Sequence, residues 1–292
     1  MFERMKRIQN NMQVRLLGRV PQRWLGAALL AGGLLSGCGL QKDVDVELPA
    51  YPPQLVVECY LEDGRLPQAL VSETVAYLSA PAPSVLTDVT VLLTGPTGQV
   101  DTLRFQPGQN NGSRKVYTHR GRRRLSIRPG DTYRLDVRDT QGRRVTGSAT
   151  MPATVPIDTV EWQFNDKPGD ARRALVLTKF RDPAGSADYY RFQVHRSNVG
   201  NNPEAEYFPD DRLLDGQAVT LGTGYEFEEQ DTLFVTLYHL DQPYYRFLRS
   251  IDDAQSANGN PFGQPAAVQS TVEGGLGVFA ILNYQRRRFI VR

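Results

Sequence analysis

The sequence predicts an all-β protein that carries one amphipathic helix. Three observations support this fold class. Short apolar or alternating runs recur along the chain, and residues typical of turns separate them. Apolar residues at helical spacing form a useful stripe once, near residues 243–257. A proline-containing segment, 152–156, separates two regions of this kind and is the best domain boundary.

Residues 55–152 are expected to form the first domain. About seven short strands with turn signals roughly every ten residues are typical of an immunoglobulin-like or transthyretin-like Greek-key sandwich. Turns such as Glu62-Asp63-Gly64 and Gly95-Pro96-Thr97-Gly98 supply residues that accept positive φ angles. The expected strands are 55–61, 69–78, 88–94, 100–105, 116–119, 125–127, 132–138 and 143–151.

Residues 157–292 are expected to form a second β-rich domain. A long polar loop is predicted over 198–213. The strands are expected at 160–164, 174–180, 189–196, 233–240, 268–272 and 276–283, with a terminal edge strand over 285–292.

The helix near 243–257 has recognisable ends. Asp241 can cap its first turn, Pro243 is tolerated there, and Gly259 can end it. Arg249 and Asp253 are spaced for an i,i+4 ion pair. The apolar stripe is expected to pack against a sheet, and its members are Tyr244, Phe247, Leu248 and Ile251.

Residues 1–37 have the pattern of a secretory leader. A basic segment precedes a 12-residue apolar run from Trp24 to Leu35, which is shorter than the roughly 20 residues of a membrane-spanning helix. The sequence Leu35-Ser36-Gly37-Cys38 resembles the lipobox of bacterial lipoproteins, in which the cysteine is acylated and the leader is cut before it. That resemblance implies a lipid anchor on Cys38. The alternative is an ordinary signal peptide with a coincidental cysteine.

Residues 38–54 are expected to be a lipidated tether. Pro49, Pro52 and Pro53 favour an extended, semi-rigid spacer. The acidic residues 43, 45 and 47 resemble export signals that send some lipoproteins to the cell surface, and the alternative is a solvated linker. Gly39 after the cysteine favours the outer membrane.

Composition limits the classes of function. Cleavage before Cys38 leaves 255 of the 292 residues, with 28 basic and 31 acidic side chains and a net charge of −3. Overall charge therefore gives no support to nucleic-acid binding. Cys59 then has no disulfide partner in the chain, and its setting in an apolar strand predicts a small buried hydrophobe.

Three segments carry a family resemblance. The first is Leu48–Glu58 after the lipobox, and the second is Asp88-Val89-Thr90-Val91. The third is Pro261-Phe262 and Pro265, followed by Val272-Glu273-Gly274-Gly275-Leu276-Gly277-Val278-Phe279. In this order they resemble the Bacteroidota lipoproteins grouped as domain of unknown function 4249. The chain departs from that pattern at Cys59 and Ala280, where small residues or glycine are usual.

The resemblance implies an outer-membrane, surface-exposed lipoprotein encoded beside a TonB-dependent transporter. It assigns no chemistry, so only the lipidated Cys38 carries over. The residues themselves predict no cofactor. The three histidines lack ligand spacing, and no phosphate loop, nucleophile elbow or EF-hand loop is present in the sequence, while a calcium site in another kind of loop stays open.

Candidate contact residues are arginines and aromatic residues in expected loops. Arg122, Arg123 and Arg124 form a basic cluster that could meet acidic lipopolysaccharide, an anionic ligand or a partner, and the alternative is solvated surface charge. Tyr207 and Phe208 are the aromatic candidates in the loop 198–213, and 80–84 is a second loop of interest.

The predicted function is a non-enzymatic binding or accessory lipoprotein beside a TonB-dependent nutrient transporter. Two alternatives stay open. One is a structural or adhesive surface protein, and the other is a hydrolase with a site at the domain junction.

Overall fold

Strand β1 (Leu55–Glu62) shows why the chain forms sheets. Its side chains alternate between buried and half-buried positions, and Leu55, Val57, Cys59 and Leu61 point into the core. The computed structural model describes residues 52–75, 84–210, 212, 214–258 and 266–292. Cys38 and most of the expected loop 80–84 lie outside the described residues.

The first half of the chain is built only from strands in its described residues. After β1 come β2 (Gln68–Glu73), β3 (Ser84–Val85), β4 (Val89–Thr94), β5 (Val100–Gln109), β6 (Val116–Arg120), β7 (Thr132–Asp139) and β8 (Arg144–Thr150).

The second half adds strands and one α-helix within the described ranges. These are β9 (Ile157–Phe164), a short 3-10 turn (Gly169–Ala171), β10 (Ala174–Arg181), β11 (Tyr189–Arg196), β12 (Ala205–Tyr207), β13 (Ala218–Gly222), β14 (Thr232–Leu240), α2 (Gln242–Asn258), β15 (Val272–Glu273) and β16 (Leu276–Ile290).

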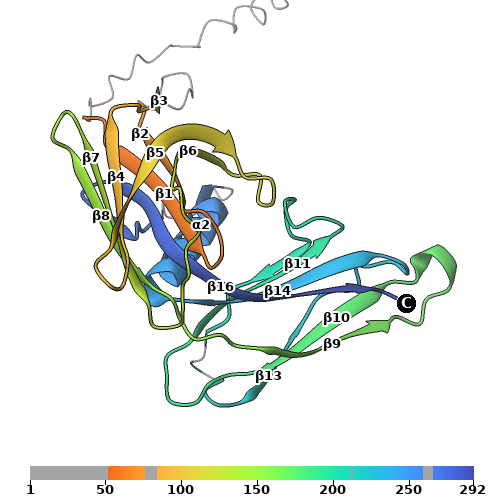
Figure 1. Ribbon diagram of the computed structural model, residues 1–292. Helices are drawn as coiled ribbons and strands as arrows, with labels where there is room; N and C mark the ends of the chain where they lie inside the picture. Colours follow the sequence, from red (N-terminus) through yellow and green to blue (C-terminus); the bar gives the residue numbers. More distant parts are fainter. Residues whose placement is uncertain (1–51, 76–83, 211, 213, 259–265) are drawn as a thin grey trace, which may run out of the picture. The chain divides into compact units, whose positions relative to one another are not determined.

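Most strands belong to one 13-stranded mixed sheet (Figure 1). Its order is β12-β11-β14-β16-β1-β2-β6-β5-β4-β7-β8-β15, with β3 beside β2, and a separate three-stranded sheet has the order β13-β10-β9. The 15-residue strand β16 joins the two halves. Its first part runs parallel to β1, and its last part pairs antiparallel with β14.

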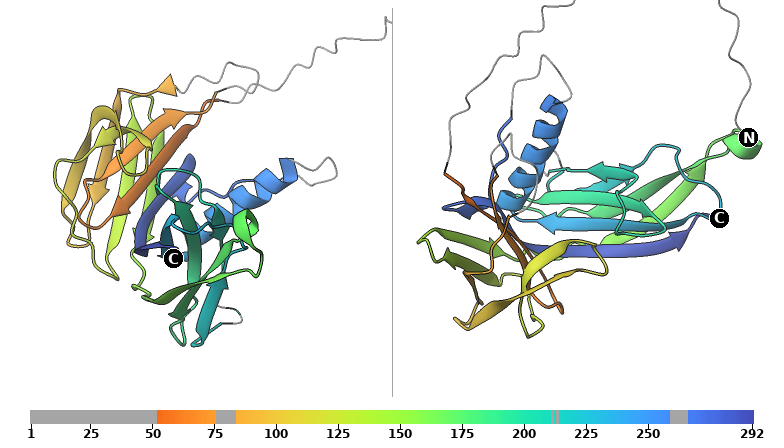
Figure 2. Two further views of the ribbon diagram at one scale, coloured as in Figure 1. Left: turned by 90° about the vertical axis from the view of Figure 1, so that its right-hand side faces the viewer. Right: turned by 90° about the horizontal axis from the view of Figure 1, so that it is seen from above.

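Three groups of buried side chains fill this framework. The first lies between β1 and β2 and the strands β4, β7 and β8, and it also takes in Val272, Phe279 and Ile281 from the end of the chain. The second joins β11, β14 and the end of β16 to the three-stranded sheet. The third packs Tyr244, Phe247 and Leu248 of α2 against β14 and β16 (Figure 2).

The predicted helix is confirmed, and its cap is the expected one. The Asp241 carboxylate accepts a hydrogen bond from the Tyr244 backbone N–H at 3.0 Å. The Arg249 guanidinium, however, pairs with Asp252 at 3.4 Å, so the expected partner Asp253 is wrong. No helix in the described ranges is long and apolar enough to cross a membrane.

Several strand predictions need correction. Residues 125–127 form no strand, because the Leu125 N–H donates to the Arg65 carbonyl and the Ile127 N–H to the Asp63 carboxylate. Strands β12 and β13 were not predicted, and β12 lies inside the expected polar loop.

The strand expected at 268–272 begins only at Val272, because the Gln269 N–H donates to the Ser250 hydroxyl of α2. The expected terminal strand is the last part of β16, where pairing with β1 has ended at Leu282 and β14 is the partner. Within the described residues the mainly β fold with one α-helix is confirmed, whereas the Greek-key topology stays a prediction.

The glycines between β15 and β16 allow close approach of three strands. A Cβ atom on Gly274 would lie 2.2 Å from the Arg144 carbonyl oxygen, and one on Gly277 would lie 2.0 Å from that of Val57. Gly277 also has a φ angle of 126°, which only glycine adopts without strain. Glycine is therefore required at both positions, because any side chain there would prevent the start of β16 from packing beside β1 and β8.

Candidate functional site

The aromatic contact candidates lie at the end of the mixed sheet. Tyr207 ends β12, is 40% exposed, and stacks on Phe192 with ring centroids 5.9 Å apart. Phe208 is half-buried, and its carbonyl accepts a hydrogen bond from the Tyr245 hydroxyl of α2 at 3.2 Å. Tyr207 is thus the more accessible of the two, while Phe208 packs against the third core.

The basic contact candidates lie elsewhere. Arg122, Arg123 and Arg124 are exposed in the connection between β6 and β7. Arg124 Nη1 donates to the Gly64 carbonyl at 2.8 Å, which holds this connection to the turn between β1 and β2. Five strands separate β12 from β6 in the sheet order, so the structure does not bring the aromatic and basic candidates together.

A set of polar and aromatic side chains that sequence reasoning missed lies beside α2. We call it the junction cluster, because its members come from strands of both halves and from the helix. Its members are Tyr60, Arg191, Gln193, Glu206, Thr236, Tyr238, Tyr244, Tyr284 and Arg286.

Hydrogen bonds fix the charged members of the junction cluster. Arg191 Nε lies 2.5 Å from Glu206 Oε1, and Gln193 Nε2 donates to the same oxygen at 2.9 Å. Arg286 Nε donates to Thr236 Oγ1 at 2.8 Å. Because each guanidinium is held by a neighbouring strand, the charges are presented in a fixed geometry.

Aromatic rings surround these guanidinium groups. The Arg286 guanidinium carbon lies 4.8 Å from the ring centroid of Tyr284, and that of Arg191 lies 5.7 Å from Tyr238. Both distances are within the range of cation–π attraction. Tyr60 and Tyr244 meet edge to face at 5.9 Å, which connects β1 to α2.

Burial favours the neutral forms of the phenols and of His195 in this region. Burial raises the pKa of Tyr244, and the Arg191 charge opposes that rise only in part. Burial raises the pKa of Tyr60 as well. Burial, and then the nearby Arg286 charge, lowers the pKa of His195, which is 4% exposed. The cluster can therefore donate hydrogen bonds and attract anions, but its phenols are poor bases at neutral pH.

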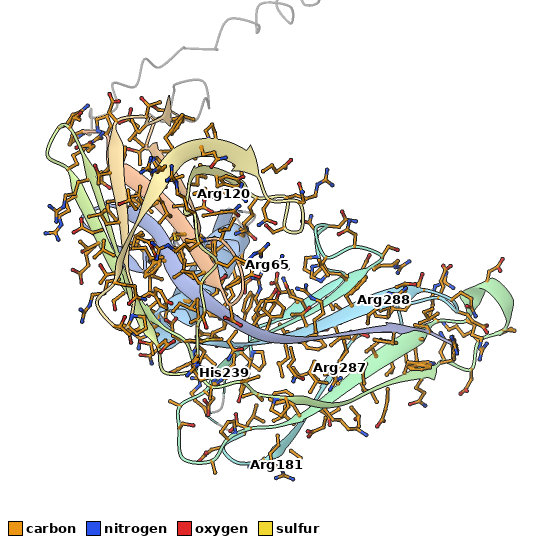
Figure 3. The ribbon with its side chains drawn as sticks, viewed as in Figure 1. Arg65, Arg120, Arg181, His239, Arg287 and Arg288 are labelled. Atoms are coloured by element: carbon orange, nitrogen blue, oxygen red, sulfur yellow. The ribbon has the colours of Figure 1, made fainter. Side chains whose placement is uncertain are left out.

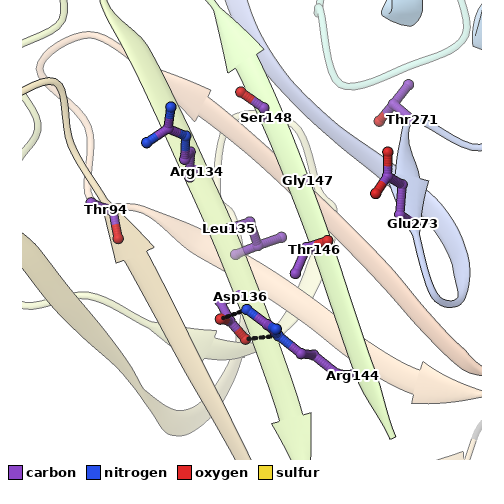
Figure 4. Close-up of a pocket in the computed structure, with 10 residues that line it drawn as sticks. All are labelled: Thr94, Arg134, Leu135, Asp136, Arg144, Thr146, Gly147, Ser148, Thr271 and Glu273. Carbon is purple, nitrogen blue, oxygen red and sulfur yellow. Dashed lines mark hydrogen bonds and ion pairs between the residues drawn. The ribbon is translucent and has the colours of Figure 1, made fainter.

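A shallow hollow of about 420 Å³ lies over β7, β8 and β15 (Figure 4). Asp136 lies on its floor between two guanidinium groups, with Arg138 Nη2 at 2.8 Å and Arg144 Nη2 at 2.7 Å. Hydrogen bonds from Arg138 and then Arg144 hold the pKa of Asp136 well below its usual range. The hollow therefore offers a ligand the hydroxyl groups of Thr94, Thr146, Ser148 and Thr271, together with the charged side chains of Arg134 and Glu273.

The three histidines do not meet. His239, labelled in Figure 3, is buried between Asp188 and the link between the two halves. Its Nε2 lies 2.8 Å from Asp188 Oδ1, and its Nδ1 lies 2.6 Å from the Ala153 carbonyl oxygen. Both ring nitrogens are thus occupied by structural contacts. No group of three or more potential metal-binding side chains is found in the described ranges.

Cys59 is a buried thiol in the first core. It is fully buried, and burial raises its pKa to about 12. The thiol therefore stays protonated at physiological pH and is a poor nucleophile. This agrees with the hydrophobic role expected from the sequence.

Comparison with known proteins identifies a family. Residues 41–288 match the family described as Domain of unknown function (DUF4249), so the chain belongs to that family. No curated protein matches this chain.

A structural comparison gives a weak match to a crystal structure of pullulanase complexed with maltotriose from Anoxybacillus sp. LM18-11. The match has 14% sequence identity and a TM-score of 0.20, and it covers 63% of this chain and 24% of that one. This likeness carries no argument about the function of the present chain.

Proposed function

We propose that this chain is a lipid-anchored, non-enzymatic binding protein of the bacterial outer membrane. It works at the cell surface of a Bacteroidota bacterium as an accessory component beside a TonB-dependent nutrient transporter. The observation that carries the proposal is the order of segments. A lipobox ending at Cys38 precedes an acidic, proline-containing spacer, and the β-structure begins at Leu55.

The physical rationale is tethering. Acyl chains on Cys38 would hold the protein at the membrane, since each buried methylene contributes about 0.8 kcal/mol. The 16 residues between Cys38 and Leu55 would let the folded part move within reach of a transporter, which raises the effective concentration of the pair.

The junction cluster supports a binding role over an enzymatic one. Its carboxylate, that of Glu206, is engaged by Arg191 and Gln193. Its guanidinium and phenol groups are suited to recognition, because they are fixed donors beside aromatic faces. The first half of the chain is further proposed to be an immunoglobulin-like or transthyretin-like sandwich, built on the alternation of buried side chains in β1 and β7.

The test is an affinity purification of the tagged, natively lipidated protein from detergent-solubilised outer membrane. Cys38→Ala is the control for anchoring, and labelling with a fatty-acid analogue checks lipidation. We expect a TonB-dependent transporter to co-purify at a near-stoichiometric level with the wild type and to be lost with Cys38→Ala.

Two results would overturn parts of the proposal. If wild-type and Cys38→Ala proteins incorporate the label equally, the anchor is not on this cysteine. If the labelled protein purifies without a transporter, the accessory role is wrong. Purification with another surface protein would instead favour the structural or adhesive alternative.

A further inference from the structure

Six arginines of the first half lie around the turn between β1 and β2. Arg65 lies in that turn, and Arg120 ends β6 (Figure 3). The other four come from β5 and from the connection between β6 and β7. We call the set the arginine surface, and its members are Arg65, Arg104, Arg120, Arg122, Arg123 and Arg124.

Backbone contacts draw these arginines together. The Gly121 N–H donates to the Pro67 carbonyl at 2.9 Å, and the Leu125 N–H donates to the Arg65 carbonyl at 2.8 Å. The connection that contains residues 122–124 therefore runs along the β1–β2 turn. Arg104 is the direct partner of Arg120 across β5 and β6, so all six lie near one end of β1.

The arginine surface is not neutralised by the protein. None of its six guanidinium groups takes part in an ion pair with a described residue. The buried Nε of Arg120 has no hydrogen-bond partner in the described ranges.

The nearest acidic side chains along the chain have other contacts. Glu62 Oε2 accepts a hydrogen bond from the Tyr284 hydroxyl at 3.3 Å, and Asp63 Oδ1 accepts from the Ile127 N–H at 2.9 Å.

This arrangement is unfavourable for the fold by itself. Like charges directly opposite each other on neighbouring strands, such as Arg104 and Arg120, are destabilising. Some arginines elsewhere are paired, as Arg143 is with Glu73 and Asp139, whereas the six of the arginine surface form no ion pair with a described residue and are drawn to one place by backbone contacts. The chain after residue 37 has a net charge of −3. The positive charge is thus a local feature, and a bound polyanion would relieve its repulsion.

We propose that the arginine surface binds an acidic polysaccharide through its sulfate or carboxylate groups. The planar guanidinium fork suits bidentate recognition of such groups. The interaction does not depend on the proposed transporter association.

A repeating, chain-like anion fits the position of the surface better than the anchoring membrane. The tether joins β1 at Leu55, whereas the arginines lie near the other end of this 8-residue strand. At about 3.3 Å per residue, the two ends are separated by about 25 Å. The surface therefore lies at the end of β1 opposite the end to which the tether is attached.

The experiment compares two polymers that share a backbone, dextran sulfate and uncharged dextran, with polygalacturonate as a carboxylate polymer. Binding to purified, lipidated protein in detergent is measured by calorimetry. The test variant changes Arg65, Arg104, Arg122 and Arg123 to Gln, because these four side chains are exposed and make no side-chain hydrogen bond with a described residue. The control variant removes four exposed arginines elsewhere, namely Arg134, Arg181, Arg246 and Arg288.

We expect dextran sulfate or polygalacturonate to bind the wild type and the control variant, and dextran not to bind. We expect the test variant to lose about tenfold or more in affinity, and added salt to weaken wild-type binding. The test variant should unfold at the same or a higher temperature without polymer, because repulsion is removed.

The proposal is overturned if both variants lose affinity equally, since overall charge would then explain binding. It is also overturned if the test variant keeps wild-type affinity for both acidic polymers. Anionic lipid vesicles are a separate arm. If only vesicles bind, and the test variant loses that binding, the surface is a membrane contact.

Discussion

The most informative single change is Gly277→Ala at the start of β16. Val57 of β1 is the direct partner of Gly277 in the parallel pairing of these strands. A Cβ atom at this position would lie 2.0 Å from the Val57 carbonyl oxygen and 2.9 Å from its backbone nitrogen. Real Cβ atoms do not approach backbone that closely, so β1 and β16 would have to separate locally.

The expected loss has two parts. Placing a side chain at a φ angle of 126° costs about 1–3 kcal/mol. Crowding a packed interior adds about 1–3 kcal/mol. We therefore expect the free energy of unfolding to fall by about 2–6 kcal/mol. For a chain of this size, that corresponds to a decrease of roughly 4–20 °C in Tm.

Gly142→Ala is a matched control. Gly142 also has a positive φ angle, 86°, but a Cβ atom there would have no neighbour within 4 Å. We expect the free energy of unfolding of this variant to fall by only about 1–2 kcal/mol, the cost of placing a side chain at a positive φ angle. The difference between the two variants then measures the clash with β1.

Denaturant unfolding of the purified protein provides the assay. Trp162 is the one tryptophan after residue 37. Its ring stacks on Phe289 near the end of β16, so its fluorescence follows the second core, while far-UV circular dichroism follows all strands. If Gly277→Ala loses no more stability than Gly142→Ala, the argument that β16 requires glycine for close approach is refuted.

Three further predictions test other contacts. The Cys59 thiol should react with a thiol reagent at pH 8 only after unfolding, because burial raises its pKa to about 12, and rapid reaction of the native protein would contradict this. The pKa of Asp136 is lowered in the folded state, so its stabilising contribution is present above the unfolded pKa of about 3.9 and is lost as the pH falls below it. The destabilisation caused by Asp136→Asn should accordingly shrink on acidification, and a constant difference in unfolding free energy down to pH 2 would refute the ion-pair explanation. His239→Ala should lower the unfolding free energy by about 1–3 kcal/mol, because the buried Asp188 carboxylate loses one of its two side-chain hydrogen-bond partners among the described residues and keeps only Ser186, and a loss below about 0.5 kcal/mol would show that this contact contributes little.

The local pattern of the sequence predicted much of the β-structure. Alternation in 132–138 and apolar character in 233–240 correspond to β7 and β14, and the stripe at 243–257 corresponds to α2. These elements could be predicted because each reflects burial of one face, which depends on residues close together in the chain. The prediction of a strand over 125–127 was wrong for the same reason, since it rested on the local pattern alone. Its two buried apolar residues suggested a strand, while its hydrogen bonds are made to the β1–β2 turn.

The candidate sites depend on pairing between strands that are distant in the sequence, and local sequence patterns do not predict such pairing. In β11, Arg191, Gln193 and His195 occupy one face, and a polar face on a strand usually indicates solvent. They form part of a half-buried cluster because β14 and β16 bring Thr236 and Arg286 beside them. A possible signal was the run of three polar residues alternating with buried ones, but apart from Glu206 the neighbours Thr236 and Arg286 lie about 40 to 95 residues away.

The sequence by itself determined the β-rich class, the helix near 243–257, the lipobox-like Cys38 and the spacing of glycines at 274–277. Each of these follows from neighbouring residues. Only the tertiary structure decided that β16 joins both halves, and that the run Arg286-Arg287-Arg288 is divided between two faces of that strand. It also decided that Arg65 and Arg104 lie near Arg120. Strand order and register place these groups together, because backbone pairing between distant segments sets which side chains become neighbours.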